Sequence, residues 1–245
     1  MGRRGEKPKS SVKTQYVKSP KKPGKKADRD IKDHMKGARF RFLNERLYTA
    51  TSDHAFDEFG HDKAFFEEYH SGFRLQAQEW PLNPLKMISK WLRNQIGPLL
   101  VADMGCGDAD LQAELQDVHQ VYSFDLVSTK PEVIAANIKD VPLEDASMDV
   151  VVFSLALMGT DWPAFLSEAR RTLKVGGTLV IAEIVSRLNT GNRFIAAVES
   201  LGFKRTTEQI VNDYFVIWRF RKEAAKPRAV QLDSALLTAC KYKIR

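Results

Sequence analysis

The chain has 245 residues and a formal net charge of +7, and 43% of its residues are hydrophobic. This length accommodates one sizeable α/β domain with an appended segment. No run of about 18 apolar residues occurs, so we expect no membrane-spanning helix, and the basic N-terminus lacks the apolar stretch of a secretory signal. The two cysteines, Cys106 and Cys240, give no disulfide framework or metal site and fit a reducing compartment.

The positive charge is concentrated at the start of the chain. Residues 1–26 hold ten of the 38 Lys and Arg residues and one of the 31 acidic residues, so the remainder is slightly acidic. Such a block cannot bury apolar surface, and we expect residues 1–33 to form a disordered basic tail. A nuclear address or a salt-sensitive contact with phosphates would use this composition, whereas a solvated tail that only aids solubility is the simpler alternative.

Residues 34–97 have the spacing of amphipathic helices. Aromatic and aliphatic residues recur at intervals of three and four between Phe40 and Phe73. Pro84 can open a further helix with an apolar stripe from Leu85 to Ile96. We expect this helical entry segment to pack on the domain that follows, with its aromatic residues mostly in the core.

The pattern changes at Leu99, where short apolar runs alternate with helical stretches and glycine-containing turns. This alternation is typical of a parallel sheet, and we assign it to a domain over residues 98–223. A turn at Asn212–Asp213 predicts an antiparallel hairpin at the sheet edge, and residues 224–245 form a C-terminal tail without a clear period. The predicted strands are Leu99–Asp103, Val121–Asp125, Val133–Asn137, Met148–Ser154, Thr178–Glu183 and Tyr214–Arg221. The predicted helices are Ala109–Leu115, Trp162–Leu173 and Leu188–Leu201.

The first predicted strand runs directly into a turn that contains Gly105 and Gly107. Glycines let the backbone bend tightly there and let a ligand approach without an intervening Cβ. Asp103, at the strand end, could orient this loop or meet a cationic group of the ligand. The third glycine of the dinucleotide-binding fingerprint is absent, and Asp108 near its place would repel a pyrophosphate. The turn therefore favours S-adenosylmethionine over NAD.

Asp125 closes the next predicted strand, 18 residues after Gly107. An acid near this spacing accepts hydrogen bonds from the ribose hydroxyls of an adenosine ligand. Alone, Asp125 would be an ordinary turn residue. Together with the glycine loop it predicts a ribose contact.

Two more segments complete a pattern that resembles the class I S-adenosylmethionine-dependent methyltransferases. One runs from Asn137 to Val152, and the other runs from Glu168 to Leu179 and includes a Leu-Lys-x-Gly-Gly turn. The resemblance implies a Rossmann-like α/β fold, with a mostly parallel seven-stranded sheet flanked by helices, an N-terminal helical extension and the basic tail. It implies S-adenosyl-L-methionine as the cofactor.

Three further segments carry a narrower resemblance: Arg39–Glu45, Tyr69–Arg74 with Trp80-Pro81, and Phe153–Thr160. With them the chain resembles the ribosomal RNA-processing protein 8 family over roughly residues 37–222. The resemblance implies N1-methylation of an adenosine in large-subunit (25S/28S) ribosomal RNA, within rRNA processing and ribosome biogenesis in the nucleus and nucleolus. Ribosomal RNA is the implied partner, with pre-ribosomal proteins or chromatin as further ones.

The family resemblance also implies which residues would line the cofactor site. His70 would reach in from the helical segment toward the methionine carboxylate, although a histidine there would otherwise be a core or surface residue. Two departures stand out, because Asp-Met is expected at Asn137-Ile138 and Cys at Ser154. Asn137 keeps a carbonyl acceptor and Ile138 an apolar wall, so we expect weaker rather than lost binding. With Asp103, the candidate cofactor-binding residues are His70, Asp103, Gly105, Asp125, Asn137, Ile138 and Ser154, and no catalytic residue is assigned.

The expected reaction is direct displacement at the sulfonium methyl, in which the enzyme mainly aligns the reacting atoms. N1 of adenine is paired in a duplex, so the base must be unpaired or extracted from the stack. We expect the acceptor pocket at Ser154–Asp161. The predicted RNA contacts are the tail and two basic groups: Lys36, Arg39, Arg41 and Arg46, and Arg219, Arg221 and Lys222.

Two other functions remain open on the sequence alone. The segment Asp140–Val152 occurs widely among small-molecule methyltransferases, against which the basic tail and the helical entry segment argue. A chromatin-associated binding protein, silencing ribosomal DNA, would keep the fold without the chemistry, and the departures at Asn137 and Ser154 are compatible with it.

Overall fold

The computed structural model describes residues 25–128, 130–188, 191–225 and 232–240. It divides the chain into two units, Met1–Met35 and Lys36–Arg245. The predicted basic tail lies outside the described residues as far as residue 24. From Lys25 the chain is helical, earlier than the boundary expected at residue 34, because no proline or glycine interrupts it between Lys25 and Gly37.

Capping side chains define where the early helices begin. Asp62 and Asn83 accept hydrogen bonds from backbone N–H groups two residues further on, each at 2.9 Å, and Pro84 occupies a first-turn position that needs no N–H donor. The helices are α1 Lys25–Thr49, α2 Ser52–His61, α3 Lys63–Gln78, α4 Pro84–Arg93, α5 Asp110–Leu115, α6 Trp162–Thr172 and α7 Gly191–Ser200, with short 3₁₀ turns η1 Val185–Arg187 and η2 Ser234–Leu236.

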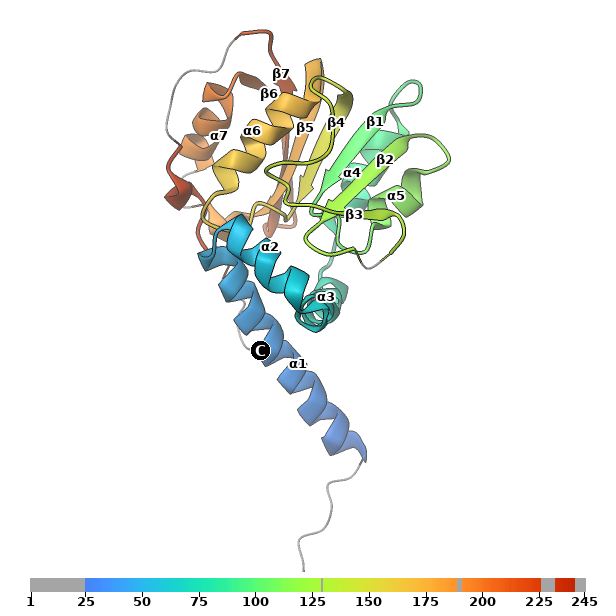
Figure 1. Cartoon of the computed structure of the whole chain (residues 1–245), viewed down its shortest axis with the longest axis vertical. Helices are drawn as coiled ribbons and strands as arrows, with labels where there is room; N and C mark the ends of the chain where they lie inside the picture. The colour runs from blue at the N-terminus through green and yellow to red at the C-terminus, as the bar shows by residue number, and fades with distance from the viewer. Residues whose placement is uncertain (1–24, 129, 189–190, 226–231, 241–245) are drawn as a thin grey trace, which may run out of the picture. The chain divides into compact units, whose positions relative to one another are not determined.

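Seven strands form one sheet with the order β3-β2-β1-β4-β5-β7-β6 (Figure 1). Strand β7 is antiparallel to both of its neighbours, and the other pairs are parallel. This confirms the predicted Rossmann-like sheet and its edge hairpin. The strands are β1 Leu100–Met104, β2 Gln120–Asp125, β3 Val133–Ala135, β4 Met148–Ser154, β5 Leu173–Ile184, β6 Phe203–Val211 and β7 Phe215–Lys222.

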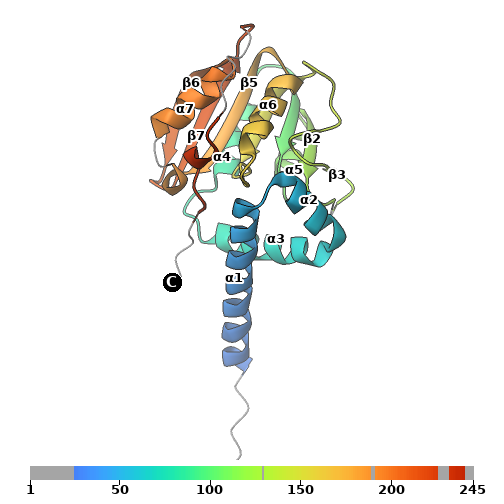
Figure 2. The same ribbon diagram turned by 60° about the vertical axis from the view of Figure 1, so that its left-hand side comes forward.

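Two apolar cores cover the two faces of the sheet. Helices α6 and α7 pack on one face around Trp162 and Phe194, and α4 and α5 pack on the other around Leu92 and Leu111. Residues from Lys36 onward in α1, with α2 and α3, contribute a third and separate cluster that includes Phe40 and Phe59. We call α1 from Lys36 onward, α2 and α3 the entry helices. Figures 1 and 2 show α2 and α3 lying across the edge at which the parallel strands end.

Three element boundaries differ from the prediction by two residues or more. Strand β3 ends at Ala135 rather than Asn137, since Asn137 turns toward α2. Strand β5 begins at Leu173 rather than Thr178, because an irregularity between Met148 and Val150 in β4 accommodates the glycine turn within the pairing. The last predicted helix begins at Gly191, after the 3₁₀ turn η1.

The C-terminal segment has a defined place where the structure describes it. Trp162 Nε1 donates to the Ser234 carbonyl at 2.9 Å, and Leu237 forms an isolated antiparallel bridge with Leu188. Over the described ranges, no helix is long and apolar enough to cross a membrane. No group of three or more His, Cys, Asp and Glu side chains in those ranges could hold a metal ion.

Candidate active site

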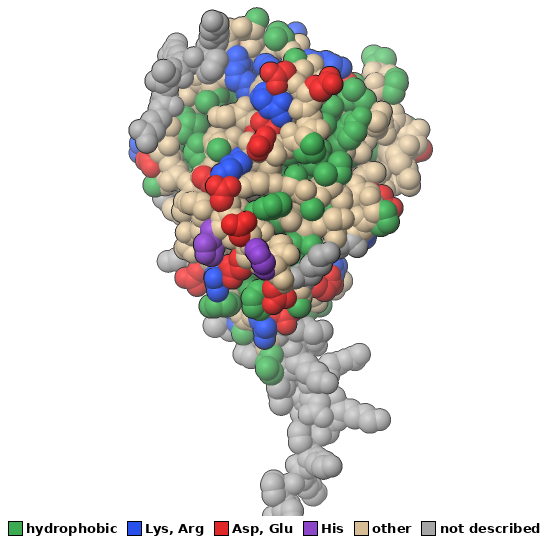
Figure 3. All heavy atoms as spheres, in the orientation of Figure 1, with side chains coloured by type: hydrophobic (Ala, Val, Ile, Leu, Met, Phe, Trp, Pro, Cys, Tyr) green, Lys and Arg blue, Asp and Glu red, His purple; other side chains and the backbone are tan. Residues whose placement is uncertain are grey.

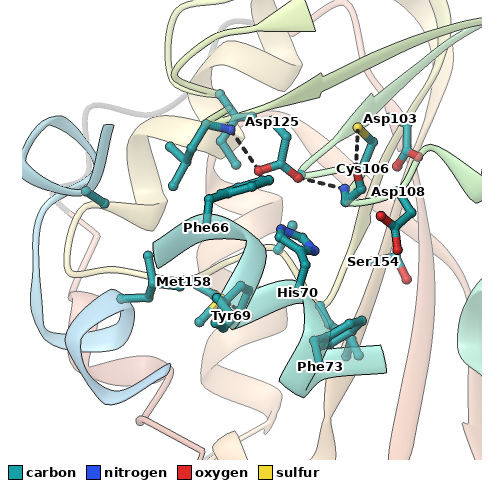
Figure 4. A pocket seen from close by; sticks show the side chains of 18 of the residues that line it. Phe66, Tyr69, His70, Phe73, Asp103, Cys106, Asp108, Asp125, Ser154 and Met158 are labelled. Atoms are coloured by element: carbon teal, nitrogen blue, oxygen red, sulfur yellow. Dashed lines mark hydrogen bonds between the residues drawn. The ribbon is translucent and has the colours of Figure 1, made fainter. Parts of the chain in front are cut away.

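A cavity of about 400 Å³ opens where β1, β2 and β4 end, beneath α2 and α3. Figure 4 shows side chains from α3 and from the strand ends converging on it. The structure brings every predicted cofactor-binding residue to its wall. These are His70, Asp103, Gly105, Asp125, Asn137, Ile138 and Ser154.

The glycine loop forms one wall of the cavity. The N–H groups of Gly105 and Cys106 both donate to the Phe124 carbonyl, at 2.8 and 2.9 Å, which fixes the loop on β2. Gly105 has a φ of +77°, and a Cβ there would lie 2.6 Å from the Ala156 Cβ. A side chain at this position would strain the backbone and collide with Ala156, which explains why position 105 is a glycine.

Asp125 holds the loop from the end of β2. One carboxylate oxygen accepts from Gly107 N at 2.6 Å and the other accepts from Leu126 N at 2.7 Å (Figure 4). Burial raises the pKa of this carboxyl group, and the charge of His70 and the two backbone donors oppose the rise. Each oxygen retains a second lone pair, so the aspartate can orient the loop and still accept a hydroxyl from a ligand.

Asp103 lies at the end of β1, and only 1% of its surface is exposed. Its Oδ2 atom is buried and has no hydrogen-bond partner in the part of the chain that the structure describes. Burial, with the charges of Asp125 and Asp110, raises the pKa of Asp103 to about 7. A carboxylate without a partner is costly in a protein interior, so the site is suited to a ligand that brings a positive charge or a donor.

His70 reaches the cavity from the middle of α3. The centroid of its ring lies 4.2 Å from that of the Phe66 ring, and its Nε2 atom is buried without a hydrogen-bond partner among the described residues. Burial lowers the pKa of His70, so the neutral form predominates near pH 7. One turn later Arg74 donates to both oxygens of Asp108, at 3.2 and 3.1 Å, which ties α3 to the glycine loop.

Asn137 joins the cavity wall to the start of α2. Its amide nitrogen donates to Ser52 Oγ and to Asp53 Oδ1, both at 3.1 Å. Ser52 is held in turn by Asp161, which accepts from its N–H at 2.8 Å and from its hydroxyl at 2.5 Å. An aspartate at position 137 would face the Asp53 carboxylate, so the asparagine fits its neighbours. Beside it, Ile138 is buried and offers an apolar surface.

The loop after β4 completes the cavity. Ser154 is partly exposed, and Leu155 adopts a φ of +61°, a strained conformation for a bulky residue. Thr160 N donates to the Ala50 carbonyl at 2.9 Å, which anchors the loop to the entry helices.

Sequence reasoning missed several residues of the site. Trp80 and Phe73 line the cavity, with their rings 5.6 Å apart, although the aromatic residues of this segment are predicted to be mostly core. Ser52 was also missed, because its contact with Asp161 joins residues 109 positions apart. Asn137 was an indirect signal for this contact, because an asparagine in place of the expected aspartate indicates different neighbouring residues.

The predicted RNA-contacting cations have different surroundings. Arg39 pairs with Glu68 at 2.5 Å, and Arg46 pairs with Glu58 at 2.7 Å. Lys222 is only partly exposed, and its ammonium group donates to the carbonyls of Arg170 and Leu173, both at 2.6 Å, so its contact with RNA stays a prediction. These hydrogen bonds secure β7 to α6.

Comparison with known proteins identifies the family. A family model described as "Hypothetical methyltransferase" matches residues 26–245. The chain is 39% identical over 220 residues to ribosomal RNA-processing protein 8 of Caenorhabditis elegans, covering 88% of this chain and 63% of that protein. It is 39% identical over 227 residues to a Schizosaccharomyces pombe protein named 25S rRNA (adenine(645)-N(1))-methyltransferase, covering 88% of this chain and 71% of the relative. The chain belongs to the ribosomal RNA-processing protein 8 family.

A further relative shows how much of the length of these proteins the chain covers. Ribosomal RNA-processing protein 8 of Dictyostelium discoideum is 43% identical over 218 residues, which cover 88% of this chain and 56% of that protein. The chain therefore spans about six tenths of the length of these first two curated relatives. The members of the ribosomal RNA-processing protein 8 family are S-adenosylmethionine-dependent methyltransferases, which confirms the family that the sequence resemblance indicates.

Solved structures agree on the fold. A Burkholderia thailandensis 1,6-didemethyltoxoflavin-N1-methyltransferase superimposes with a TM-score of 0.54 at 17% identity, covering 66% of this chain and 86% of that one. A TehB-like methyltransferase from Corynebacterium glutamicum also gives 0.54, at 18% identity, over 66% of this chain and all of that one. At these identities the likeness concerns the class I methyltransferase fold alone.

Proposed function

We propose that this member of the ribosomal RNA-processing protein 8 family transfers the methyl group of S-adenosylmethionine to N1 of an adenine in large-subunit ribosomal RNA. The observation that carries the proposal is the cavity itself. It combines a glycine wall with two buried atoms, Asp103 Oδ2 and His70 Nε2, for which the described ranges offer no hydrogen-bond partner. The name of the Schizosaccharomyces pombe relative supports the choice of substrate and atom.

The wall of the cavity fits the parts of this cofactor. Asp125 would accept the ribose hydroxyls, since both of its oxygens keep a free lone pair. The buried Asp103 would interact with a cationic group of the cofactor. The glycine loop leaves room for the part of the cofactor that carries this group. Ile138 and the backbone beside Asn137 would flank the adenine ring, and His70 would donate to the methionine carboxylate. Ser154 would lie where methyl donor and acceptor meet.

The chain would contribute alignment and a dry environment to the reaction. S-adenosylmethionine supplies an activated methyl group when bound. The entry helices cover the cavity and exclude water, so the acceptor and donor can be held in line. Adenine N1 carries no proton, so no general base is required. The acceptor base would enter at the Ser154–Asp161 loop, where the N–H of the strained Leu155 donates to the Ala182 carbonyl of β5 at 2.9 Å.

The proposed organisation follows from these roles. Residues 34–97 would close the site, residues 98–223 would bind the cofactor, and the basic residues 1–33 would add contacts with RNA phosphates. Residues 224–245 would form the C-terminal tail. A nucleolar location within the nucleus accords with a role in processing ribosomal RNA, alongside pre-ribosomal proteins.

A methylation assay tests the proposal. The protein would be incubated with S-adenosylmethionine and unmodified large-subunit rRNA, and the digested RNA would be analysed for methylated nucleosides by mass spectrometry. We expect N1-methyladenosine to rise, and Asp125→Ala to abolish the rise. A different methylated nucleoside would refute the choice of atom, and cofactor binding without any RNA methylation would refute the proposed substrate and favour a binding role.

A further inference from the structure

A second groove lies at the opposite end of the sheet from the cofactor cavity. It is formed by the end of α4, by the glycine turn within β5 and by the end of β7. The residues that matter for its chemistry are Trp91, Gln95, Lys174 and Arg221. Strand β4 has seven residues between the two ends, so the groove and the cavity are separated by roughly 20 Å at about 3.3 Å per residue.

Basic side chains are gathered on the face of the β6–β7 hairpin that borders the groove. Lys204 and Arg221 are directly opposite each other in the antiparallel register, and Arg219 follows on the same face. Like charges in directly opposed positions repel each other. Among the described residues, none of these three cations forms an ion pair with an acid. The arrangement therefore has a positive charge that the protein does not neutralise.

The one acid in the groove is already used. Asp149 binds Lys174 at 2.7 Å through one oxygen, and its other oxygen accepts from Leu100 N at 2.9 Å. Among the described residues, no ion pair joins it to Arg219 or Arg221.

Arg219 is held in a defined orientation. Its guanidinium carbon lies 4.9 Å from the centre of the Trp91 ring, a cation–π contact. Burial lowers the pKa of Arg219, and no acid counteracts this. Stacking on the ring engages the flat face of the guanidinium group. In the described part of the chain, its N–H edge has no acceptor, and such an edge matches the oxygens of a phosphate.

On the opposite face of the molecule, Arg171 is an example of a basic side chain that is paired with acids. There Arg171 pairs with Asp145 and with Glu168, both at 2.7 Å. Figure 3 shows acidic and basic side chains next to one another over the face that carries α6 and α7. The clustered cations of the groove differ from Arg171 in that no described acid pairs with them.

We propose that this groove, together with Arg219 stacked beside it on Trp91, binds the phosphate backbone of the substrate RNA, with Arg219 and Arg221 as the principal contacts. The inference rests on the proposed function, because it presumes an RNA substrate. At this distance from the cavity the groove would contact RNA outside the methylated nucleotide. It would therefore govern RNA affinity, and leave cofactor binding and the rate of methyl transfer unchanged.

The test uses the full chain and a double variant, Arg219→Gln with Arg221→Gln. Binding of a fluorescently labelled hairpin from large-subunit rRNA would be followed by anisotropy over a range of salt concentrations. Each lost phosphate contact lowers the salt slope by about 1, so we expect a decrease of about 2 and a raised KM for RNA. The kcat and the Kd for S-adenosylhomocysteine should not change.

Arg205→Gln is the matched control, because Arg205 lies on the other face of the same hairpin and pairs with Glu208. Arg221→Gln alone, at an exposed position, provides a second test should the double variant not fold. An unchanged salt slope and KM would overturn the groove as an RNA site, as would an equal loss in the control. If the unmodified protein neither binds nor methylates the RNA, the proposed function itself has failed.

Discussion

Replacing Asp103 by Asn should change how the stability of the protein depends on pH. The pKa of Asp103 rises from an ordinary value of 3.8 to about 7 in the folded protein. Between these values the folded state keeps a proton that the unfolded state has released, so the free energy of unfolding falls as pH rises. A tenfold change in acidity corresponds to 1.36 kcal/mol, so Asp103 costs about 4 kcal/mol above pH 7.

The amide introduced by Asp103→Asn does not titrate, so the variant should escape this loss. The difference in unfolding free energy between the variant and the unmodified protein should be small near pH 4 and should grow in favour of the variant to about 4 kcal/mol near pH 8. Urea unfolding of both proteins without cofactor, at a series of pH values, measures it. A constant cost of burying the amide shifts the curves without changing how the gap grows.

The same change should weaken cofactor binding. An ionised Asp103 would stabilise a cationic group of the ligand, so calorimetry should show lower affinity for S-adenosylhomocysteine in the variant at pH 8. The unmodified protein should lose affinity as pH falls below about 7, because Asp103 then takes up a proton. Parallel stability curves for the two proteins would refute the reasoning, since Asp103 would then titrate normally.

Three further substitutions test other parts of the structure. Gly105→Ala should reduce cofactor affinity more than tenfold by calorimetry, because its Cβ would meet Ala156 at 2.6 Å, whereas Gly60→Ala, with open space around it, should leave affinity unchanged. Arg187→Met should cost about 3–5 kcal/mol in urea unfolding, since it strands the buried Glu183 carboxylate that Arg187 binds at 2.5 Å; adding Glu183→Gln should restore part of the loss, and no restoration would contradict the buried-charge explanation. Gly72→Ala should cost about 1–3 kcal/mol through overpacking, because its Cβ would overlap the Phe40 Cβ; a circular dichroism melt identical to that of the unmodified protein would count against this close crossing of α1 and α3.

Local sequence patterns were sufficient to predict the sheet and one side of the cavity. Gly105, Asp103 and Asp125 sit at the ends of consecutive strands, and parallel strands bring their carboxyl ends to a common edge. Those residues could therefore be predicted to meet without any knowledge of distant contacts. His70 was predicted only from the family resemblance, because nothing in the helical pattern separates a pocket histidine from a core one.

Contacts between distant segments could not be predicted in the same way. The hydrogen bond of Ser52 with Asp161 depends on how α2 docks on the loop after β4. The direction of Lys222 depends on which carbonyls come within its reach, and the charge of the side chain is the same either way. Arg219 and Arg221 are basic residues of the same strand as Lys222, yet no acid among the described residues pairs with them.

The separate apolar cluster of the entry helices has a consequence for local opening. Phe40, Phe59 and Phe66 pack among themselves, and not within either core of the sheet. Such a cluster can unfold as its own cooperative unit, at a free energy below that of the whole protein. Amide hydrogen exchange should therefore be faster in α2 and α3 than in β4 and β5, and bound ligand should slow it there most. Reactants could then enter and leave by partial unfolding of the covering helices while the sheet keeps its structure.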